Sequence, residues 1–378
     1  MTDDRLQGAS GEVVARALRE RDALPGTGGF AGTLPDGRAV RDVLGRYPLF
    51  TDRDSGAASH DPTALDVPVR LPAGVVRSPD GDEQVWTLPS PDPYADDGAA
   101  VAALRTAIDG RADAVAGADL AVAFSGGVDS ATVAALSPDV PLYVAGFPGS
   151  PDIQAARETA RLWGREESLR VVHLDHAAVR EHAVTVAHAT GRTNAMDVAI
   201  AVPLIAVARR AREDGYRRLS VGQGADELFG GYDKVARAPD DPRVEADTVR
   251  GAASEVLAGL PAQLERDVLA LRAADVEPVA PLLHDHVVRV ALRLSGHQLV
   301  SERGERKVTL RRAARASVPD RVAFREKRAA QYGSRVAREL DRLAREAGFE
   351  RSADHHVCRY LTDLTGEVPT VKRSLGAI

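Results

Sequence analysis

The hexapeptide SGGVDS, Ser125 to Ser130, combines residue types that bind phosphate. It follows the apolar run Leu120 to Phe124 and precedes a helical pattern, so we expect a turn from a strand into a helix. Two glycines allow a tight turn in which backbone N–H groups face an anion at the helix N-terminus. Asp129 would repel phosphate unless a divalent cation lies between them, and Mg²⁺ meets that need. A plain serine-capped turn is the alternative, but the full hexapeptide in this position favours a phosphate loop.

Two other nucleotide-binding motifs are excluded by inspection. No lysine follows a glycine anywhere in the chain, so a Walker A loop is absent. The turn Gly222-Gln223-Gly224 has Glu227 where a dinucleotide fingerprint needs its third glycine.

The elements that position this loop are predicted to alternate between strand and helix. The Pro- and Asp-rich stretch 88–98 is a linker, and segments before it suggest a few antiparallel strands. The pattern after it predicts an α/β fold, a parallel sheet with helices on both faces. From about Arg243 onward strand signals stop and a helical extension follows. The predicted strands are 120–124, 142–147, 169–174 and 218–222, and the predicted helices include 152–163 and 197–213.

Composition limits the functional classes. The net charge of −6 over 378 residues does not favour nucleic-acid binding. The opening residues lack a signal-peptide pattern, and the longest apolar stretch is too short to span a bilayer, so we expect a cytoplasmic protein. Cys358 is the only cysteine, which excludes an intrachain disulfide and a multi-cysteine metal site.

Lysine is scarce in this chain, which has 45 arginines and four lysines. Lys307 and Lys327 are two of the four, and a lysine in an arginine-rich chain indicates a position that needs a compact, rotatable ammonium group.

Two motifs together carry a resemblance to a known family. SGGVDS resembles the pyrophosphate loop of the ATP-pyrophosphatase superfamily, and VGQGADELFGGY, Val221 to Tyr232, is similar to a segment of asparagine synthetases. Segments at 277–281, 307–314 and 324–334 follow in the family's order. RDVLGRYPLF, 41–50, is similar to part of the family's glutaminase domain. The resemblance implies residues 1–95 as a truncated glutaminase-like β-rich region and residues 96–378 as the ATP-pyrophosphatase domain with a helical C-terminal part.

The resemblance also implies a chemistry and its residues. ATP and Mg²⁺ would be used to convert a small-molecule carboxylate to an acyl-adenylate, with release of pyrophosphate and, after an amine attacks, of AMP. Asp129 and Asp226 would hold Mg²⁺, and Lys307 and Lys327 would lie over the phosphates, with Arg325 and Arg328 auxiliary. The implied ATP and pyrophosphate contacts are Phe124, Ser125, Gly126, Gly127, Asp129, Ser130, Gly146 and Gly222.

The sequence departs from the family pattern at several positions. No cysteine precedes Cys358, so glutamine hydrolysis is not expected, and the nitrogen donor is ammonia, an amine, or ammonia from a separate protein. Gln223 replaces a glutamate thought to deprotonate the amine, and glutamine cannot act as a base. Ala199 replaces an arginine that holds aspartate, which leaves open whether Asp197 instead meets a positively charged group. His284 replaces an aspartate, and Asp285 follows it.

Two alternatives remain open. One is a superfamily enzyme that modifies a nucleobase or another carbonyl, against which the long match at 221–232 weighs. The other is a nucleotide-binding protein that has lost catalysis, which Gln223 and Ala199 motivate.

Overall fold

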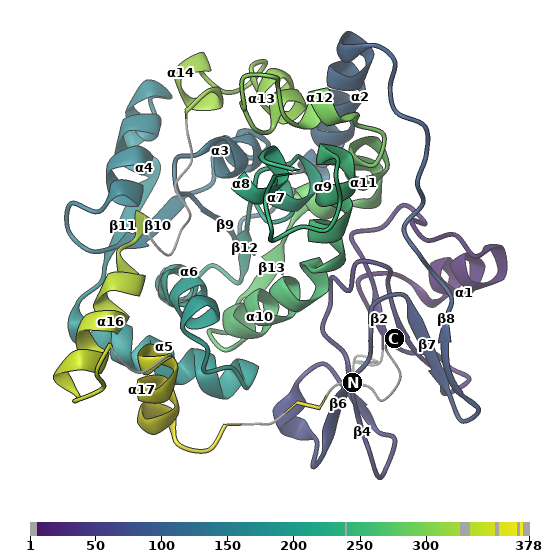
Figure 1. Cartoon of the computed structure of the whole chain (residues 1–378), viewed down its shortest axis with the longest axis horizontal. Coiled ribbons are helices and arrows are strands. Elements are labelled where there is room, and N and C mark those ends of the chain that lie inside the picture. The colour runs from purple at the N-terminus through teal and green to yellow at the C-terminus, as the bar shows by residue number, and fades with distance from the viewer. Residues whose placement is uncertain (1–5, 239, 326–332, 352–354, 369–370, 373–378) are drawn as a thin grey trace.

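A computed structural model of the protein describes residues 6–238, 240–325, 333–351, 355–368 and 371–372. Its centre is a five-stranded parallel sheet with the order β11-β10-β9-β12-β13 (Figure 1). The α/β prediction is therefore confirmed. These strands are β9 Leu120–Ala123, β10 Leu142–Gly146, β11 Leu169–His173, β12 Arg218–Ser220 and β13 Glu277–Val279.

The fifth strand corrects the prediction that strands end before Arg243. β13 lies at the edge of the sheet and pairs only with β12, Arg218 opposite Glu277. It is three residues long and contains Pro278, which cannot donate a ladder hydrogen bond and is tolerated at an edge. So short a segment carries no period-2 apolar pattern, which is why sequence reasoning missed it.

Alternate side chains of the central strands enter two separate cores. Val122 and Leu142 pack with one set of helices, whereas Ala121 and Tyr143 pack with the other. Helices therefore cover both faces of the sheet, as predicted. The first set includes α2 Asp97–Asp109, α3 Val128–Ala135, α4 Pro151–Leu162, α9 Val249–Ala258, α11 Asp285–Ala291 and α13 Val308–Ala314. The second includes α5 His176–Thr190, α6 Ala195–Glu213, α16 Val336–Glu346 and α17 His356–Thr365.

Both helices predicted by residue range are present. α4 begins with Pro151 at its first position, where a missing N–H is harmless. α6 begins after Asn194, whose side chain accepts a hydrogen bond from the Asp197 backbone N–H. The remaining α-helices described within residues 96–368 are the 13-residue α10 Leu260–Arg272 and the short helices α7 Ala225–Leu228, α8 Asp233–Ala236, α12 Gly296–Leu299 and α14 Asp320–Ala323.

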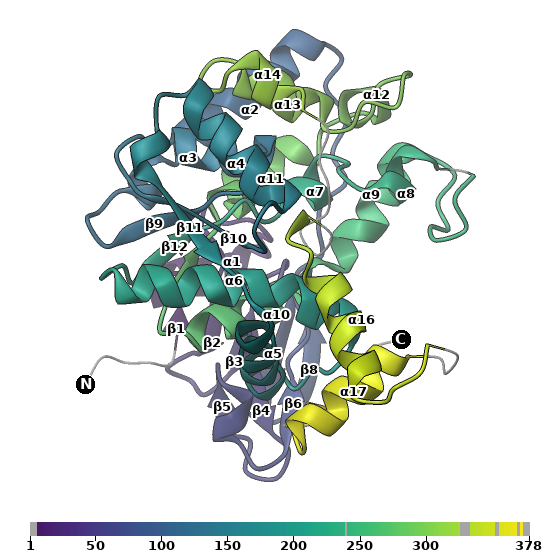
Figure 2. The same ribbon diagram turned by 90° about the vertical axis from the view of Figure 1, so that its left-hand side faces the viewer.

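The N-terminal region forms small antiparallel sheets, as predicted. One has the order β1-β2-β3-β7-β8 and the other β5-β4-β6. α10 lies between these sheets and the parallel sheet in both views (Figures 1 and 2). The bounds are β1 Leu6–Gln7, α1 Gly11–Glu20, β2 Ala31–Thr33, β3 Ala39–Arg41, β4 Phe50–Asp52, β5 Ala58–Ser59, β6 Pro68–Arg70, β7 Val75–Ser78 and β8 Gly81–Gln84.

The end of the described chain returns to this region. Lys372 forms a parallel bridge with Val69 of β6: its N–H donates to Pro68 O at 3.0 Å, and its O accepts from Arg70 N at 3.1 Å.

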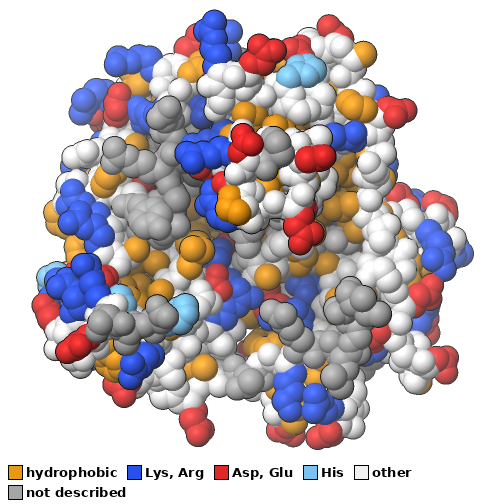
Figure 3. Space-filling model, viewed as in Figure 1, with side chains coloured by type: hydrophobic (Ala, Val, Ile, Leu, Met, Phe, Trp, Pro, Cys, Tyr) orange, Lys and Arg blue, Asp and Glu red, His pale blue; other side chains and the backbone are white. Residues whose placement is uncertain are grey.

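No single helix within the described ranges is long and apolar enough to cross a membrane. α5 and α6 reach the length and hydropathy of a membrane-spanning segment only when taken together, and their axes are bent by 109° relative to each other. On the face seen in Figure 3, acidic and basic side chains are interspersed, in keeping with the modest net charge.

Candidate functional site

The loop Ser125–Ser130 is pressed against α4. Gly126 has φ +75°, and a Cβ there would lie 2.5 Å from the backbone C and O of Ala155, so only glycine fits. Thr159 Oγ1 donates to Gly126 O at 2.9 Å. The Arg325 guanidinium donates to Ala155 O at 3.1 Å and to Thr159 Oγ1 at 3.0 Å. α4 and Arg325 together therefore fix the conformation of the loop.

The N-terminus of α3 opens from this loop. Gly127 is the N-cap, and no described side chain caps the helix. Ser125 Oγ and Ser130 Oγ lie 3.4 Å apart, and Ser130 Oγ donates to Gly127 O at 3.2 Å. The first N–H groups of α3 therefore have no side-chain cap among the described residues, and such a helix N-terminus can bind an anion.

Two carboxylates and one ammonium meet beside the loop. Lys307 Nζ lies 2.7 Å from Asp129 Oδ1 and 2.6 Å from Asp226 Oδ1. The Lys307 side chain is 2% exposed and that of Asp129 8%, while that of Asp226 is 24% exposed. Three segments far apart in the sequence therefore converge at this point.

Close backbone approaches set this geometry. A Cβ at Gly222, just after β12, would lie 3.0 Å from Asp129 Cβ, so the strand end packs directly on the start of α3. A Cβ at Gly231 would lie 2.1 Å from Asp226 Oδ1 and 2.3 Å from Lys307 Cε. Lys307 itself has φ 61°, an uncommon backbone conformation for a residue with a Cβ.

The carboxylate pair suits Mg²⁺, which often takes one or two protein carboxylates and keeps several waters. Both Asp129 Oδ1 and Asp226 Oδ1 already face one cation, the Lys307 ammonium. Among the described residues no group of three or more His, Cys, Asp or Glu could hold a metal ion. A bound Mg²⁺ would therefore depend on these two aspartates and on the phosphates of the nucleotide.

Gln223 is engaged with a carboxylate from another element. Its Nε2 donates to Asp267 Oδ2 of α10 at 2.6 Å. Asp267 Oδ1 accepts from Arg266 Nε at 2.6 Å, and Arg266 donates in turn to Asp197 Oδ1 at 2.8 Å. The amide of Gln223 is thus oriented by a chain of charged groups.

Asp197 meets two arginines of the chain itself. Arg192 donates to its Oδ2 at 3.0 Å, and Arg266 to its Oδ1. Burial opposes ionisation, but hydrogen bonds from Asn194 and Arg266 outweigh it, so the pKa of Asp197 is lowered. Asp197 therefore already has two positively charged partners within the protein, Arg192 and Arg266. Ala199, two residues further along α6, is 1% exposed.

His284 and Asp285 have separate roles. Burial, Arg111 and neighbouring cationic groups lower the pKa of His284 to about 4, so this side chain is neutral near pH 7. Asp285 is buried and accepts hydrogen bonds from the backbone N–H groups of Gly26 and Thr27 and from Arg46. It therefore anchors the N-terminal region to the start of α11.

The other predicted contacts fall around the same edge of the sheet. Phe124, at the end of β9, stacks on Trp163 with ring centroids 6.3 Å apart, and it is buried. Gly146 ends β10, where a Cβ would lie 2.5 Å from Ser150 Oγ. Lys327 and Arg328 lie outside the described residues.

Sequence reasoning missed Thr159, Gly231, Arg266 and Asp267. Gly231 could have been singled out, because it belongs to the GGY run beside Asp226. The other three carry no motif, and only the packing of α4 and α10 brings them to the site.

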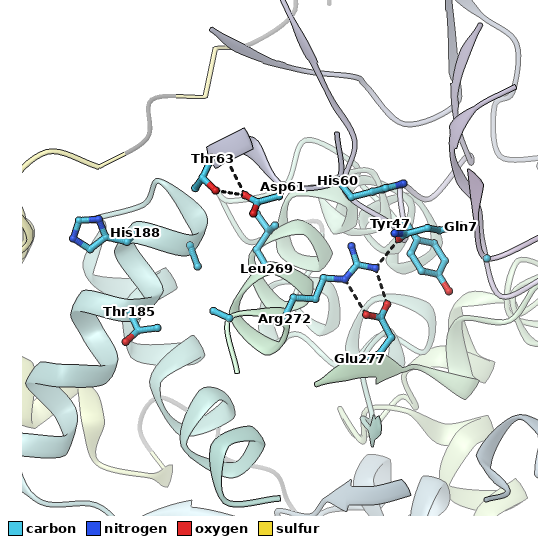
Figure 4. A pocket seen from close by; sticks show the side chains of 13 residues that line it. Gln7, Tyr47, His60, Asp61, Thr63, Thr185, His188, Leu269, Arg272 and Glu277 are labelled. Atoms are coloured by element: carbon cyan, nitrogen blue, oxygen red, sulfur yellow. Dashed lines mark hydrogen bonds and ion pairs between the residues drawn. The ribbon is translucent and has the colours of Figure 1, made fainter. Parts of the chain in front are cut away.

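A separate cavity lies elsewhere on the molecule. Its volume is about 770 Å³, and Figure 4 shows it lined by Tyr47, by His188 of α5 and by Arg272 of α10. Arg272 is bound there to Glu277 and Gln7. Glu277 begins β13, so this cavity opens at the amino edge of the sheet, whereas the Ser125–Ser130 loop lies at the carboxyl edge. The cavity is therefore separate from the Ser125–Ser130 loop.

Comparisons with known proteins agree with this geometry. The family model "Asparagine synthase" matches residues 101–259 and 240–361. A Methanocaldococcus jannaschii protein that carries the name asparagine synthetase (glutamine-hydrolyzing) 1 is 30% identical over 261 residues, which are 60% of this chain and 48% of that protein. Asparagine synthetase B (glutamine-hydrolyzing) of Escherichia coli is 28% identical over 228 residues, 54% of this chain and 40% of that protein.

The chain spans less than half the length of these curated relatives. The family match, however, extends over most of the chain and includes the Ser125–Ser130 loop, Asp226 and Lys307. The chain therefore belongs to the asparagine synthase family.

Proposed function

We propose that this protein is an ATP-dependent carboxylate–amine ligase that forms an acyl-adenylate and releases pyrophosphate and AMP, without hydrolysing glutamine. The observation that carries the proposal is the convergence of Asp129, Asp226 and Lys307 beside the uncapped N-terminus of α3. The Lys307 ammonium suits the pyrophosphate end of a nucleotide, and the two carboxylates suit the Mg²⁺ that would accompany it. The family match supports the same chemistry.

In the first step, several residues of the chain bind the phosphates of ATP and one stabilises the leaving group. Backbone N–H groups at the start of α3, with the hydroxyls of Ser125 and Ser130, hold the β- and γ-phosphates. A substrate carboxylate oxygen attacks the α-phosphorus, and the bond to the bridging oxygen of the β-phosphate breaks. Lys307 then stabilises negative charge on the departing pyrophosphate. Mg²⁺, when bound, supplies further charge neutralisation at Asp129 and Asp226.

Lys307 has to change partners in this scheme. Its ammonium bridges both aspartates and neutralises one of their two charges. Asp129 and Asp226 would hold Mg²⁺ when a nucleotide is bound, and Lys307 would then be able to turn its ammonium toward the phosphates. Lysine suits such an exchange, since its ammonium is compact and turns freely on a flexible stem.

Gln223 serves as an orienting group. In the second step an amine nitrogen attacks the acyl carbon, the bond to the AMP oxygen breaks, and the amine loses a proton. Glutamine cannot accept that proton, so the amine must arrive neutral or lose its proton to water or to a phosphate oxygen. With Nε2 bound to Asp267, the amide oxygen of Gln223 is the atom left to accept a hydrogen bond from the amine.

The test is a screen for substrate-dependent pyrophosphate release. The protein is incubated with ATP, Mg²⁺, ammonia or an amine pool, and a panel of carboxylic acids, and both pyrophosphate and AMP are measured. We expect at least one acid to elicit both products in equal amounts, and Asp129→Asn to lower the rate by about a hundredfold or more. Tight ATP binding without turnover across the panel would instead support a nucleotide-binding protein that has lost catalysis.

A further inference from the structure

We propose that the N-terminal region acts as a clamp that positions the active-site segment 221–226, through two separate chains of contacts. The consequence for catalysis rests on the proposed ligase function, whereas the clamp itself is a statement about structure. Arg46, Arg70, Glu265 and Asp285 are its positioning residues. The region would thus have a use in this chain that does not depend on glutamine hydrolysis.

The first chain of contacts runs through Asp285. Arg46 donates to Asp285 Oδ1 at 2.7 Å and to the backbone O of Leu283 at 2.8 Å. Leu283 in turn packs under Gly224, where a Cβ would lie 2.3 Å from Leu283 Cδ2. Gly224 has φ 84° and is the N-cap of α7, which carries Asp226. Arg46 of the N-terminal region therefore contacts Leu283, and Leu283 packs against Gly224 at the start of the helix that carries Asp226.

The same arginine is fixed inside its own region. Arg46 Nε donates to Asp42 Oδ1 at 2.8 Å, and both side chains are buried. Burial lowers the pKa of Arg46, but Asp42 and Asp285 raise it more, so the net shift is upward and the group stays charged. A buried guanidinium with partners in both regions can hold them in only one relative position.

The second chain of contacts runs through Glu265 of α10. Arg70 of β6 makes a bidentate pair with Glu265, at 2.5 and 2.6 Å. Arg192 bridges Glu265 and Asp197, at 3.1 and 3.0 Å. From Asp197 the contacts continue through Arg266 to Asp267 and end on Gln223.

Loss of the arginines that surround Glu265 would destabilise the folded protein. Its side chain is 1% exposed, and only the arginines around it offset the burial that opposes its charge, so that its pKa is lowered. Two of those arginines, Arg41 and Arg70, belong to the N-terminal region. Movement of that region would leave a buried carboxylate short of positive charge, which proteins tolerate poorly.

The other active-site loop is held differently. Gly126 is fixed by Thr159 of α4 and by Arg325, both within the synthase part. The clamp therefore predicts that a weakened N-terminal contact loosens 221–232 and leaves 120–131 unchanged. This contrast separates positioning from general destabilisation.

Hydrogen–deuterium exchange of the full-length chain tests the clamp. The variants are Arg70→Gln, which alters a side chain that is 26% exposed, and Asp285→Asn, which keeps the shape of the side chain. Arg38→Gln is the matched control, because it removes a charge from the same region whose partner is the exposed Asp36. We expect peptides covering 221–232 to exchange about two- to thirtyfold faster in the two variants and at the wild-type rate in the control. Arg70→Lys, which keeps the charge, should restore most of the protection.

The exchange results at 221–232 and 120–131 test the clamp independently of whether the ligase assay succeeds. Unchanged exchange at 221–232 in folded Arg70→Gln protein would overturn the clamp, whatever the enzyme activity. Equal acceleration in 120–131 would overturn it too, because it would show general loosening. If the ligase assay succeeds, Arg70→Gln should lower kcat about two- to thirtyfold with the KM for ATP unchanged. If that assay finds no substrate, the exchange result still decides the clamp.

Discussion

Gln223 and Asp267 form a matched pair. An amide at position 223 can donate to the Asp267 carboxylate, and the distance of 2.6 Å shows that it does. A carboxylate at 223 would face a second carboxylate across the same distance. Asp267 therefore favours an amide over a carboxylate at position 223, and the two residues are best substituted together.

This pairing gives a prediction for a double-mutant cycle. Gln223→Glu should lower the free energy of unfolding by about 1–3 kcal/mol, since a hydrogen bond is replaced by two facing carboxylates. Gln223→Glu with Asp267→Asn should recover most of that loss, because the new amide can donate to the new carboxylate. Urea unfolding of all four proteins measures the coupling. Additive losses in the double variant would show that the two side chains do not interact.

His284 gives a prediction of pH dependence. Its pKa falls from 6.5 in the unfolded chain to about 4 in the folded protein. Between pH 6.5 and pH 4 the unfolded chain therefore binds a proton at His284 that the folded protein does not bind. Stability that is present above pH 6.5 is therefore lost as the pH falls toward 4. His284→Asn removes this group but retains an N-cap for α11. Urea unfolding between pH 7 and 4 should show a shallower decline in the variant than in the wild type, and parallel declines would contradict the assignment.

The residues that carry the proposed chemistry were largely predictable. The SGGVDS motif, the segment around Asp226 and the rarity of lysine pointed to Asp129, Asp226 and Lys307, which the structure places in direct contact. That Lys307 bridges the aspartates was not predictable, because a strained backbone conformation leaves no mark in a single sequence. Asp267 was missed because nothing near it distinguishes it from an exposed helical aspartate.

At the scale of elements, α4 supports the phosphate loop through one buried hydroxyl. Thr159→Val keeps the shape of the side chain but leaves Gly126 O without its shortest hydrogen bond. We expect a loss of about 1–3 kcal/mol in the free energy of unfolding and a weaker affinity for Mg²⁺–ATP, measured by calorimetry. Thr159→Ser is the control, since it retains the donor. Equal affinities in the valine and serine variants would show that α4 does not hold the loop.

The elements themselves were predictable where their patterns were long. α6, with nineteen residues, and the buried β10 gave clear signals. β13 did not, and its place is set by β12 and by the turn at Asp275, where φ is 55°. Its Val279 O accepts the N–H of Val221 and so fixes the start of the Gln223 segment. Tertiary contacts thus decided the one strand that local sequence could not.

At the scale of the whole molecule, the two tryptophans report on different parts. Trp86 is buried in the N-terminal region, and Trp163 stacks on Phe124 beside the phosphate loop. Because buried ion pairs join the two parts, we expect them to unfold together. Trp86→Phe and Trp163→Phe each leave one tryptophan as a fluorescent reporter. In each variant, the midpoint of urea unfolding measured by fluorescence should equal the midpoint measured by circular dichroism. A fluorescence transition displaced from circular dichroism would mean that the parts unfold independently.

The bridge between Val69 and Lys372 bears on how the protein is made. The residue that pairs with the outer edge of β6 is synthesised about three hundred positions after β6 itself. Asp285, Glu265 and Arg272, which hold the same region, also emerge long after it. During translation the N-terminal region therefore lacks these contacts until the later segments have been synthesised.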